Sequence, residues 1–309
     1  MSKDIDLVSQ VASKFLNDRR PRVVPVERRG HVNKVFRVET SDTKLLIRVR
    51  NESIAFDEYR KEAWCIDKAA SLNVPVATVL EVGVFDDHPY MIQPFIPGDE
   101  GRDSSFPRND IWKQLGKYAR LIHSVQVAGF GLTYSNLTQG NAQASWLEYL
   151  PYNIESLNED DELLRRNVLT QPQSKIIGHI FEELEGQSFT FGLNHGDLSV
   201  KNVIVDESGK VTLLDWGSAE ASMVPHHDLI QLLKMNMLEN DPDDGEIHSF
   251  LEGYGLSRTE FALMLPTLET LLLLRAFDKL RWAIDCGIEG LESYIIHARR
   301  AVVRKLSNP

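Results

Sequence analysis

Residues 195–202 read His-Gly-Asp-Leu-Ser-Val-Lys-Asn, and residues 214–217 read Leu-Asp-Trp-Gly. Residues 203–213, which lie between them, form two runs rich in β-branched side chains around a turn that contains glycine. This pattern predicts a β-hairpin with a polar side chain at each open end.

The register of this hairpin decides which polar residues meet. A hairpin that is symmetric about residues 208–209 pairs Val203 with Leu214, and one step further out it brings Asn202 opposite Asp215. Directly opposed residues lie about 5 Å apart. Carboxylate and amide oxygens at that separation suit Mg²⁺ held jointly with nucleotide phosphates.

Asp197 lies five residues before Asn202, in the segment that enters the hairpin. It can sit beside a metal without being a ligand, as a base that accepts the proton of a substrate hydroxyl. A single Asp or Asn at a strand end usually serves as a turn or cap residue. Asp197, Asn202 and Asp215 together have the spacing of a phosphoryl-transfer site, Asp-x-x-x-x-Asn followed by Asp-x-Gly.

The residues of the two motifs resemble those of the aminoglycoside phosphotransferase and choline kinase-like family of small-molecule kinases, which is part of the phosphotransferase enzyme family. They resemble the motifs of the protein kinases less closely. The resemblance implies that Asp197 is the catalytic base and that Asn202 and Asp215 hold Mg²⁺. It also implies that His195 orders the catalytic loop. These motifs say little about the acceptor.

The fold implied by the resemblance is α+β and two-lobed, like that of the protein kinases. Residues 1–97 are expected to form the nucleotide-binding lobe around an antiparallel sheet. Residues 98–309 are expected to form a larger, mostly helical lobe for catalysis and acceptor binding. A chain of 309 residues can bury a core of that size.

Two strands joined by a polar turn are predicted at residues 34–39 and 44–50. In the second strand, Arg48 shares a face with Arg50. The fold uses a cation on this strand to hold the nucleotide phosphates, and the position is often Lys. We expect Arg48 to be this anchor, because a guanidinium offers a fixed charge and a fork for phosphate oxygens. Arg50 is the competing candidate, and a solvated edge-strand arginine is the alternative.

Glu62 lies in a helix predicted from about residue 54 to residue 72. Its neighbours at helical spacing, Tyr59, Ile66 and Ala69, form an apolar face, so the carboxylate needs a partner. Arg48 is the expected one, because kinases fix the strand cation through such an ion pair. A surface position on a misjudged helix phase is the alternative.

Two further segments are expected to contact the nucleotide. Residues 30–33, which end in Asn33, form the loop before the first strand, where protein kinases carry a glycine-rich phosphate loop. This loop contains only one glycine, and a plain turn is the alternative. A strand that begins near Pro89 and ends in a Pro/Gly breaker corresponds to the interlobe hinge. There the Pro94 carbonyl and the Ile96 amide are expected to bind the adenine edge, because proline has no N–H. A plain strand end is the alternative.

The remaining polar clusters have weaker interpretations. Asp228 follows two histidines at a helix start and is expected to brace the catalytic loop by hydrogen bonding, while His123 ends a helix predicted from residue 111. The acidic runs 159–162 and 239–246 are expected to be solvated helix ends or loops. An acidic lip for a cationic acceptor is the minority interpretation.

Composition fits a cytoplasmic enzyme. A net charge of −11 disfavours nonspecific binding to nucleic acid or to anionic membranes. The two cysteines, Cys65 and Cys286, have no metal or redox spacing. No transmembrane helix is expected, because the most apolar region, 261–274, is too short and is interrupted by Pro266.

Asp228 lies only eleven positions after Gly217, too close for the activation segment that docks a polypeptide substrate. The sequence therefore predicts a kinase that transfers the γ-phosphate of ATP, or of GTP, to a hydroxyl of a small molecule. An aminoglycoside-like polyol amine is the first expectation. Choline, a sugar or an amino alcohol are alternatives, and a catalytically silent nucleotide-binding protein is the alternative of another class.

Overall fold

The structure is a computed structural model that describes residues 2–17, 21–26, 34–52 and 54–307. The chain divides into two compact units, and each contains two stretches of sequence. The first unit comprises Met1–Phe106 and Ser199–Ala219, and the second comprises Pro107–Leu198 and Glu220–Pro309. The predicted hairpin therefore belongs to the first unit, whereas the expected boundary after residue 97 placed it in the helical lobe.

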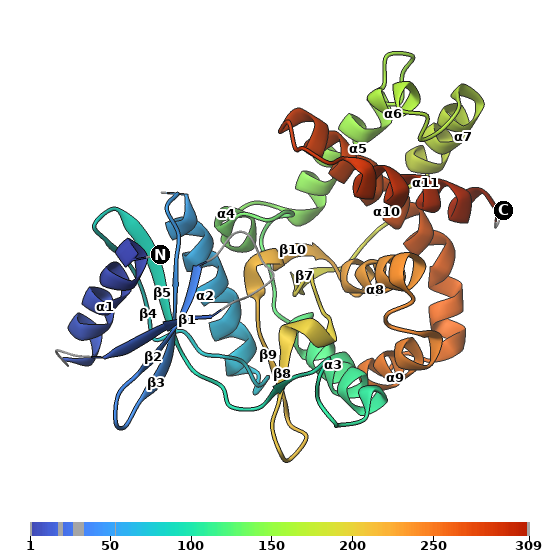
Figure 1. Ribbon diagram of the computed structural model, residues 1–309. Helices are drawn as coiled ribbons and strands as arrows, with labels where there is room; N and C mark the ends of the chain where they lie inside the picture. Colours follow the sequence, from blue (N-terminus) through green and yellow to red (C-terminus); the bar gives the residue numbers. More distant parts are fainter. Residues whose placement is uncertain (1, 18–20, 27–33, 53, 308–309) are drawn as a thin grey trace. The chain divides into compact units, whose positions relative to one another are not determined.

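The first unit is built on a five-stranded antiparallel sheet with the order β1-β2-β3-β5-β4 (Figure 1). The two strands predicted from residues 34 and 44 are β2 and β3. The strand that was expected to end in a breaker ends at Pro94. The sheet strands are β1 (Arg22–Pro25), β2 (Lys34–Glu39), β3 (Lys44–Val49), β4 (Glu81–Phe85) and β5 (His88–Pro94).

Two helices flank this sheet: α1 (Ser2–Leu16) and α2 (Ala55–Ser71). The alternation of β3 assigns its faces, because Leu45, Ile47 and Val49 are buried in one apolar cluster with side chains of α1. Arg48 points to the opposite face, where it meets α2. The first unit thus keeps its apolar core on one face of β3 and a charged contact on the other.

The predicted hairpin exists, but its register differs by one residue from the expected one. Val203 pairs with Leu213, and the Leu214 amide donates to the Asn202 carbonyl at 2.9 Å, so Asn202 does not face Asp215. The cause is the turn, in which the Asp206 carboxylate accepts bonds from Ser208 and Lys210. This closes a three-residue loop with Gly209 at φ 80°. The strands are β8 (Val203–Val205) and β9 (Val211–Leu213), and β6 (Asp99–Glu100) pairs with β8.

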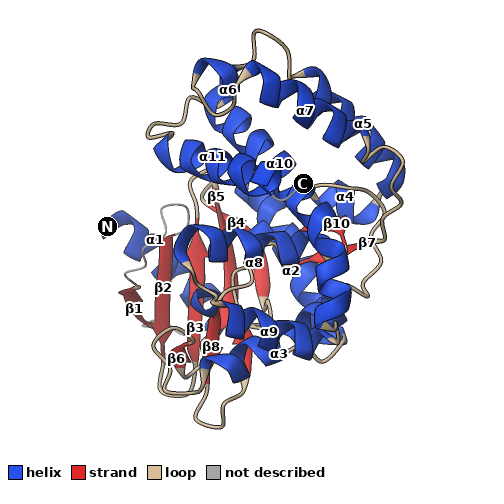
Figure 2. Cartoon of the chain, turned by 90° about the vertical axis from the view of Figure 1, so that its right-hand side faces the viewer, coloured by secondary structure: helices blue, strands red, loops and turns tan. Residues whose placement is uncertain are grey.

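The second unit is mostly helical around one antiparallel pair, β7 (Phe191–Asn194) with β10 (Glu220–Met223). Figure 2 shows its helices, among which α10 is the longest and packs on α5, α6, α7, α8, α9 and α11. The helices are α3 (Arg108–Ile122), α4 (Tyr134–Thr138), α5 (Ala142–Glu155), α6 (Glu162–Arg165), α7 (Gln171–Glu182), α8 (His226–Glu239), α9 (Asp244–Tyr254), α10 (Arg258–Asp285) and α11 (Glu292–Ser307).

Candidate active site

The segment 195–198 of the second unit is held by a buried carboxylate. Asp228, at the first turn of α8, accepts hydrogen bonds from the Gly196 amide at 2.8 Å and from the His195 amide at 3.3 Å. His123 Nε2 lies 2.9 Å from the same carboxylate. Gly196 has φ 78°, a left-handed conformation that suits glycine. The structure thus contains the brace expected of Asp228.

The pKa of Asp228 reflects these contacts. Complete burial alone would raise the pKa, but the hydrogen bond from His123 and the charges of nearby histidines bring it from 3.8 to about 2. Asp228 therefore stays ionised, and its charge strengthens the bonds to the loop amides.

Asp197 is exposed, whereas His195, two residues earlier, is fully buried. The Asp197 amide donates to Nδ1 of His195 at 3.4 Å. The histidine ring therefore supports the backbone of the loop from inside, and the Asp197 side chain projects to the surface. This placement fits a loop-ordering histidine and an accessible base.

In the first unit, Arg48 and Glu62 form a bidentate ion pair. Nη1 and Nη2 of Arg48 lie 2.6 and 3.1 Å from the two oxygens of Glu62, and the guanidinium lies over the Tyr59 ring. Burial would lower the pKa of Arg48, but the charges of Glu62 and Asp215 raise it overall. The ion pair that the sequence led us to expect is present, and the arginine keeps its charge.

Asp215 lies beside this pair. A methyl group placed on Gly217 would be 3.6 Å from Oδ1 of Asp215 and 3.7 Å from Oε1 of Glu62, so both carboxylates border the same small space. Asp215 has φ 57°, which is uncommon for a residue other than glycine and recurs at functional sites. The geometry therefore gathers Arg48, Glu62 and Asp215 in one unit.

The sequence did not indicate a role for Lys61, which contacts the turn after Asp215. Its side chain is buried, and Nζ donates to the Gly217 carbonyl at 2.7 Å. Two adjacent residues of α2 therefore help to position Arg48 and Asp215, because Glu62 binds Arg48 while Lys61 binds the turn that carries Asp215.

The other expected nucleotide contacts are placed as follows. Arg50, the competitor of Arg48, is bound by Glu58 and by Glu52. Pro94 ends β5, and Ile96 is half-buried just beyond it. Asn33 lies outside the described residues, so the expectation for its loop stays a prediction.

Two negative findings concern the described part of the chain. Within it, no group of three or more His, Cys, Asp or Glu side chains could hold a metal ion by itself. The Asp215 carboxylate and the Asn202 amide supply three oxygens at most, and a site of this kind needs phosphates or waters to be complete. Among the described helices, none is long and apolar enough to cross a bilayer.

Comparison with known proteins identifies the family of this chain. Residues 25–265 match the phosphotransferase enzyme family. The chain belongs to this family. A curated relative, the probable serine/threonine-protein kinase RTK1 of Saccharomyces cerevisiae, is 28% identical over an alignment of 127 residues that covers 38% of this chain. The match covers only 19% of the relative's length.

Solved structures share the fold over nearly the whole chain. A thermostable variant of aminoglycoside phosphotransferase APH(4)-Ia, in complex with AMP-PNP and hygromycin B, superposes with a TM-score of 0.69 at 16% identity, covering 98% of this chain and 99% of the other. The GDP and kanamycin complex of APH(2")-IIIa gives 0.67 at 14% identity, with coverages of 98% and 99%.

A putative fructosamine-3-kinase from Haemophilus somnus 129PT gives a TM-score of 0.64 at 12% identity, with 97% of each chain covered. The family member described here is thus a phosphotransferase with a kinase-like α+β fold, as its sequence predicted. Identities of 12–17% do not determine the acceptor.

Asp228→Asn is expected to lower the free energy of unfolding at neutral pH by about 1.5–3 kcal/mol, because the buried carboxylate loses the charge that strengthens its hydrogen bonds to His123 and to the loop amides. The folded pKa is depressed, so this stabilisation is present above the unfolded pKa of 3.8 and is lost as the pH falls towards 2. Urea unfolding of both proteins from pH 7 to pH 3 should show the difference shrinking below about pH 4. Asp110→Asn, at an exposed position in the first turn of α3, is the control. A difference in unfolding free energy that is independent of pH would contradict the role of Asp228 as an ionised residue that holds the loop.

Proposed function

We propose that this phosphotransferase moves the γ-phosphate of ATP to a hydroxyl group of a small molecule, with Mg²⁺ as the metal. The observation that carries the proposal is the buried Arg48–Glu62 ion pair beside Asp215. A fixed cation next to a carboxylate in a strained backbone conformation is the arrangement that holds nucleotide phosphates and their metal.

The residues have distinct roles in this proposal. Asp197 accepts the proton of the acceptor hydroxyl, and His195 orders the loop that carries it. Arg48 binds phosphate oxygens, and Glu62 orients Arg48. The Asp215 carboxylate and the Asn202 amide oxygen hold Mg²⁺, which neutralises charge on the phosphates. The fit is good, because Mg²⁺ binds through one or two protein oxygens together with substrate phosphates and water.

The adenine edge is assigned to the segment after β5. Pro94 offers a carbonyl oxygen, and none of the described residues accepts a hydrogen bond from the Ile96 N–H. GTP remains an alternative donor, since the relative that binds kanamycin was solved with GDP.

For the acceptor, the first candidate is an aminoglycoside-like polyol amine, because two relatives carry hygromycin B and kanamycin. Choline, a sugar or an amino alcohol would use the same chemistry. Nucleotide consumption measured with aminoglycosides, macrolides, choline and sugars tests the proposal. Mg²⁺-dependent nucleotide binding without turnover on any hydroxyl compound would favour a catalytically silent protein instead.

Arg48→Ala is expected to raise the KM for nucleotide or to lower kcat by about tenfold or more, because a desolvated charge-assisted contact to phosphate is lost. Glu62→Ala should have a smaller effect, since Glu62 acts through Arg48. The double variant should be far from additive in steady-state kinetics, because the pair acts as a unit. Arg48→Lys distinguishes a simple charge from a required guanidinium fork.

Arg50→Ala is the matched control, because Arg50 lies on the same face two residues away and is bound by Glu58 and Glu52. It should leave the nucleotide KM within about threefold of the wild type, because its two carboxylate partners are exposed to solvent and such ion pairs contribute little. A larger effect at Arg50 than at Arg48 would transfer the anchor to Arg50.

A further inference from the structure

A chain of hydrogen bonds extends from the segment 195–198 to helix α9 of the same unit. Asp228 accepts hydrogen bonds from the Gly196 amide and from Nε2 of His123. Nδ1 of this histidine lies 2.9 Å from the hydroxyl of Tyr254. His123 caps the end of α3, and Tyr254 is the last residue of α9. The chain therefore links the ends of two helices to the loop of the proposed catalytic base.

The direction of these hydrogen bonds follows from the charge of Asp228. An ionised carboxylate only accepts hydrogen bonds, so Nε2 of His123 carries the proton of their contact. In the neutral imidazole this leaves Nδ1 as an acceptor for the Tyr254 hydroxyl. Burial and the charge of Asp228 raise the pKa of Tyr254 to about 12, so the phenol remains a donor at neutral pH. Tyr254 therefore favours the tautomer of His123 that donates to Asp228.

The main chain of His123 is fixed beside β7, the strand that directly precedes the segment 195–198. The Leu193 amide of β7 donates to the Val125 carbonyl at 3.1 Å. A methyl group on Gly192 would lie 2.5 Å from the carbonyl oxygen of His123, so this close approach requires glycine. The backbone of His123 thus has a defined position, and its ring is oriented by its two hydrogen bonds.

Two glycines allow α3 and α9 to pack backbone to backbone. A methyl group on Gly116 of α3 would lie 2.0 Å from the carbonyl oxygen of Phe250. A methyl group on Gly253 of α9 would lie 1.9 Å from the carbonyl oxygen of Lys113. Tyr254 follows Gly253 directly, so this close packing brings its side chain to the end of α3.

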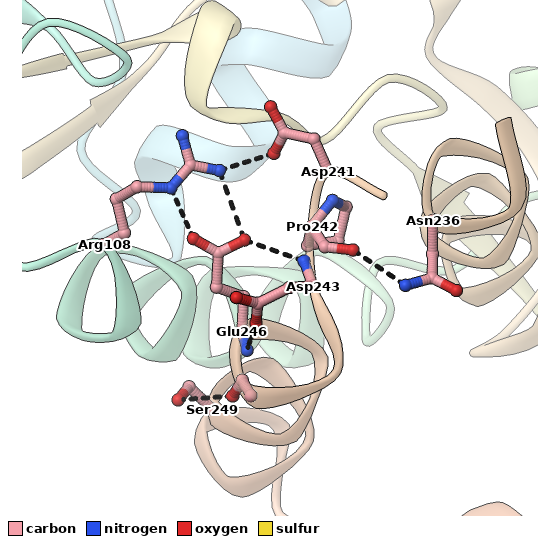
Figure 3. A network of polar contacts seen from close by, with 8 residues as sticks. Arg108, Asn236, Asp241, Pro242, Asp243, Glu246 and Ser249 are labelled. Atoms are coloured by element: carbon pink, nitrogen blue, oxygen red, sulfur yellow. Dashed lines mark hydrogen bonds and ion pairs between the residues drawn. The ribbon is translucent and has the colours of Figure 1, made fainter. Parts of the chain in front are cut away.

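The start of α9 is fixed to α3 by charge. Arg108, at the start of α3, forms ion pairs with Asp241 and with Glu246 of α9 (Figure 3). Glu246 also accepts the Asp243 amide at 2.9 Å in the capping box that begins α9. These carboxylates belong to the acidic run 239–246, and their protein partners make them poorly suited to an acidic lip for a cationic acceptor. Helix α9 is thus attached to α3 along its length.

We propose that Tyr254 is a positioning residue for phosphate transfer, which acts through His123 and Asp228 on the loop of the catalytic base. The inference rests on the proposed function, which assigns Asp197 to the acceptor hydroxyl. Without the Tyr254 hydroxyl, the His123 ring loses the contact that fixes its tautomer and orientation. Its hydrogen bond to Asp228 then weakens, and the carboxylate holds the loop amides less well. Asp197 is in consequence less often aligned with the acceptor.

Tyr254→Phe tests the hydroxyl alone, because it keeps the ring, which stacks on Phe250 with the ring centres 6.3 Å apart. Turnover is measured as ADP release from ATP and Mg²⁺ with kanamycin, choline or glucose as acceptor, and with water alone. The kcat should fall by about two- to tenfold, the effect of one hydrogen bond, while the KM for ATP stays unchanged. An unchanged kcat would overturn the inference.

Tyr118→Phe is the matched control. Tyr118 is also half-buried, and its hydroxyl donates to Gln114 of the same helix at 3.3 Å. This variant should leave kcat unchanged. An equal loss of kcat in Tyr118→Phe and Tyr254→Phe would reflect a general effect of removing a phenol from this helix pair, and would overturn the inference.

His123→Gln tests whether the hydroxyl acts through His123. The glutamine side chain can donate to Asp228, but it offers Tyr254 no acceptor at the position of Nδ1. Adding Tyr254→Phe to His123→Gln should therefore cause no further loss of kcat. Equal losses from Tyr254→Phe in the wild type and in His123→Gln would show that the hydroxyl acts independently of His123, and the inference would be wrong.

Amide hydrogen exchange, followed by NMR, measures the loop directly and requires no turnover. In Tyr254→Phe the protection of the Gly196 amide should fall by about two- to tenfold. The Gly131 amide, which donates to the Ala221 carbonyl at 2.8 Å in the same unit, should keep its protection. Unchanged protection at Gly196, or an equal fall at both amides, would overturn the inference.

The kinetic and exchange measurements separate this inference from the proposed function. Absence of phosphate transfer by the wild type to every acceptor and to water would count against the proposed function. The exchange of the Gly196 amide would then still decide whether Tyr254 holds the loop. Faster exchange at Gly196 with an unchanged kcat, in an enzyme that transfers phosphate, would retain the proposed function and reject the positioning role of Tyr254.

Discussion

Asp197→Asn is expected to keep nucleotide binding and to lower turnover by about two to four orders of magnitude, the usual contribution of a general base. Asn has nearly the same size and still hydrogen-bonds, but it cannot accept the proton of a hydroxyl. The side chain is exposed, its own amide donates to His195, and the amide of the neighbouring Gly196 donates to Asp228, so the loop should keep its shape.

The measurement pairs steady-state turnover with direct titration of AMP-PNP in the presence of Mg²⁺. Asp110→Asn, in the same unit and also exposed, controls for the loss of one surface charge. Turnover of Asp197→Asn within about tenfold of wild type would remove Asp197 from the catalytic role. A parallel loss of AMP-PNP affinity would instead indicate that Asp197 helps to hold the metal.

Local periodicity was sufficient to predict the strand that carries Arg48 and the helix that carries Glu62. The alternation in β3 placed Arg48 on the face away from the apolar cluster, and the helical spacing in α2 placed Glu62 on an inner face. Lys61 escaped this reasoning because α2 packs against both the sheet and the turn after Asp215, so adjacent residues on two sides of the helix are buried. A pattern of apolar residues along one face of a helix cannot reveal that a second face is buried as well.

The hairpin register could not be predicted from symmetry alone. The runs of β-branched residues marked the strands, but the turn was set by a side chain, because the Asp206 carboxylate binds the amides of Ser208 and Lys210. The left-handed conformations of Gly209 and Asp215 then end the regular ladder at both sides. A register argument based on regular strands therefore misplaced Asn202 relative to Asp215 by one residue.

The hydrogen bonds of Asp228 could be predicted only in part from the sequence. Its place at a helix start predicted a hydrogen-bonding role, but its partner His123 lies 105 residues earlier, where the sequence indicates only the end of a helix. His123 does cap α3, and it is buried against Tyr254 as well. Contacts over such separations leave no periodic signal in a single sequence, so they required the folded chain.

Removal of the metal is expected to abolish activity, and Asp215→Asn is expected to weaken metal binding, so that activity returns only at a higher Mg²⁺ concentration. Asn tolerates the left-handed conformation seen at position 215, so this variant removes the charge with little added backbone strain. A neutral amide is a weaker ligand than a carboxylate for a hard divalent cation. The apparent Mg²⁺ requirement should therefore rise by about tenfold or more, as for the loss of a charge-assisted contact.

The experiment titrates Mg²⁺ in both turnover and AMP-PNP binding, after treatment with chelator, and repeats the series with Mn²⁺. Asp206→Asn is the matched control, because Asp206 lies at the turn of the same hairpin and is exposed to solvent. That variant should lose only a small part of its stability with the turn bonds and keep its metal requirement. Asp215 is a ligand only if the metal strengthens AMP-PNP binding to the wild type and this gain is reduced in Asp215→Asn. Equal nucleotide affinity with and without metal would reject the pairing of Asn202 and Asp215 as a magnesium site, and would leave Asp215 as a partner of Arg48 alone.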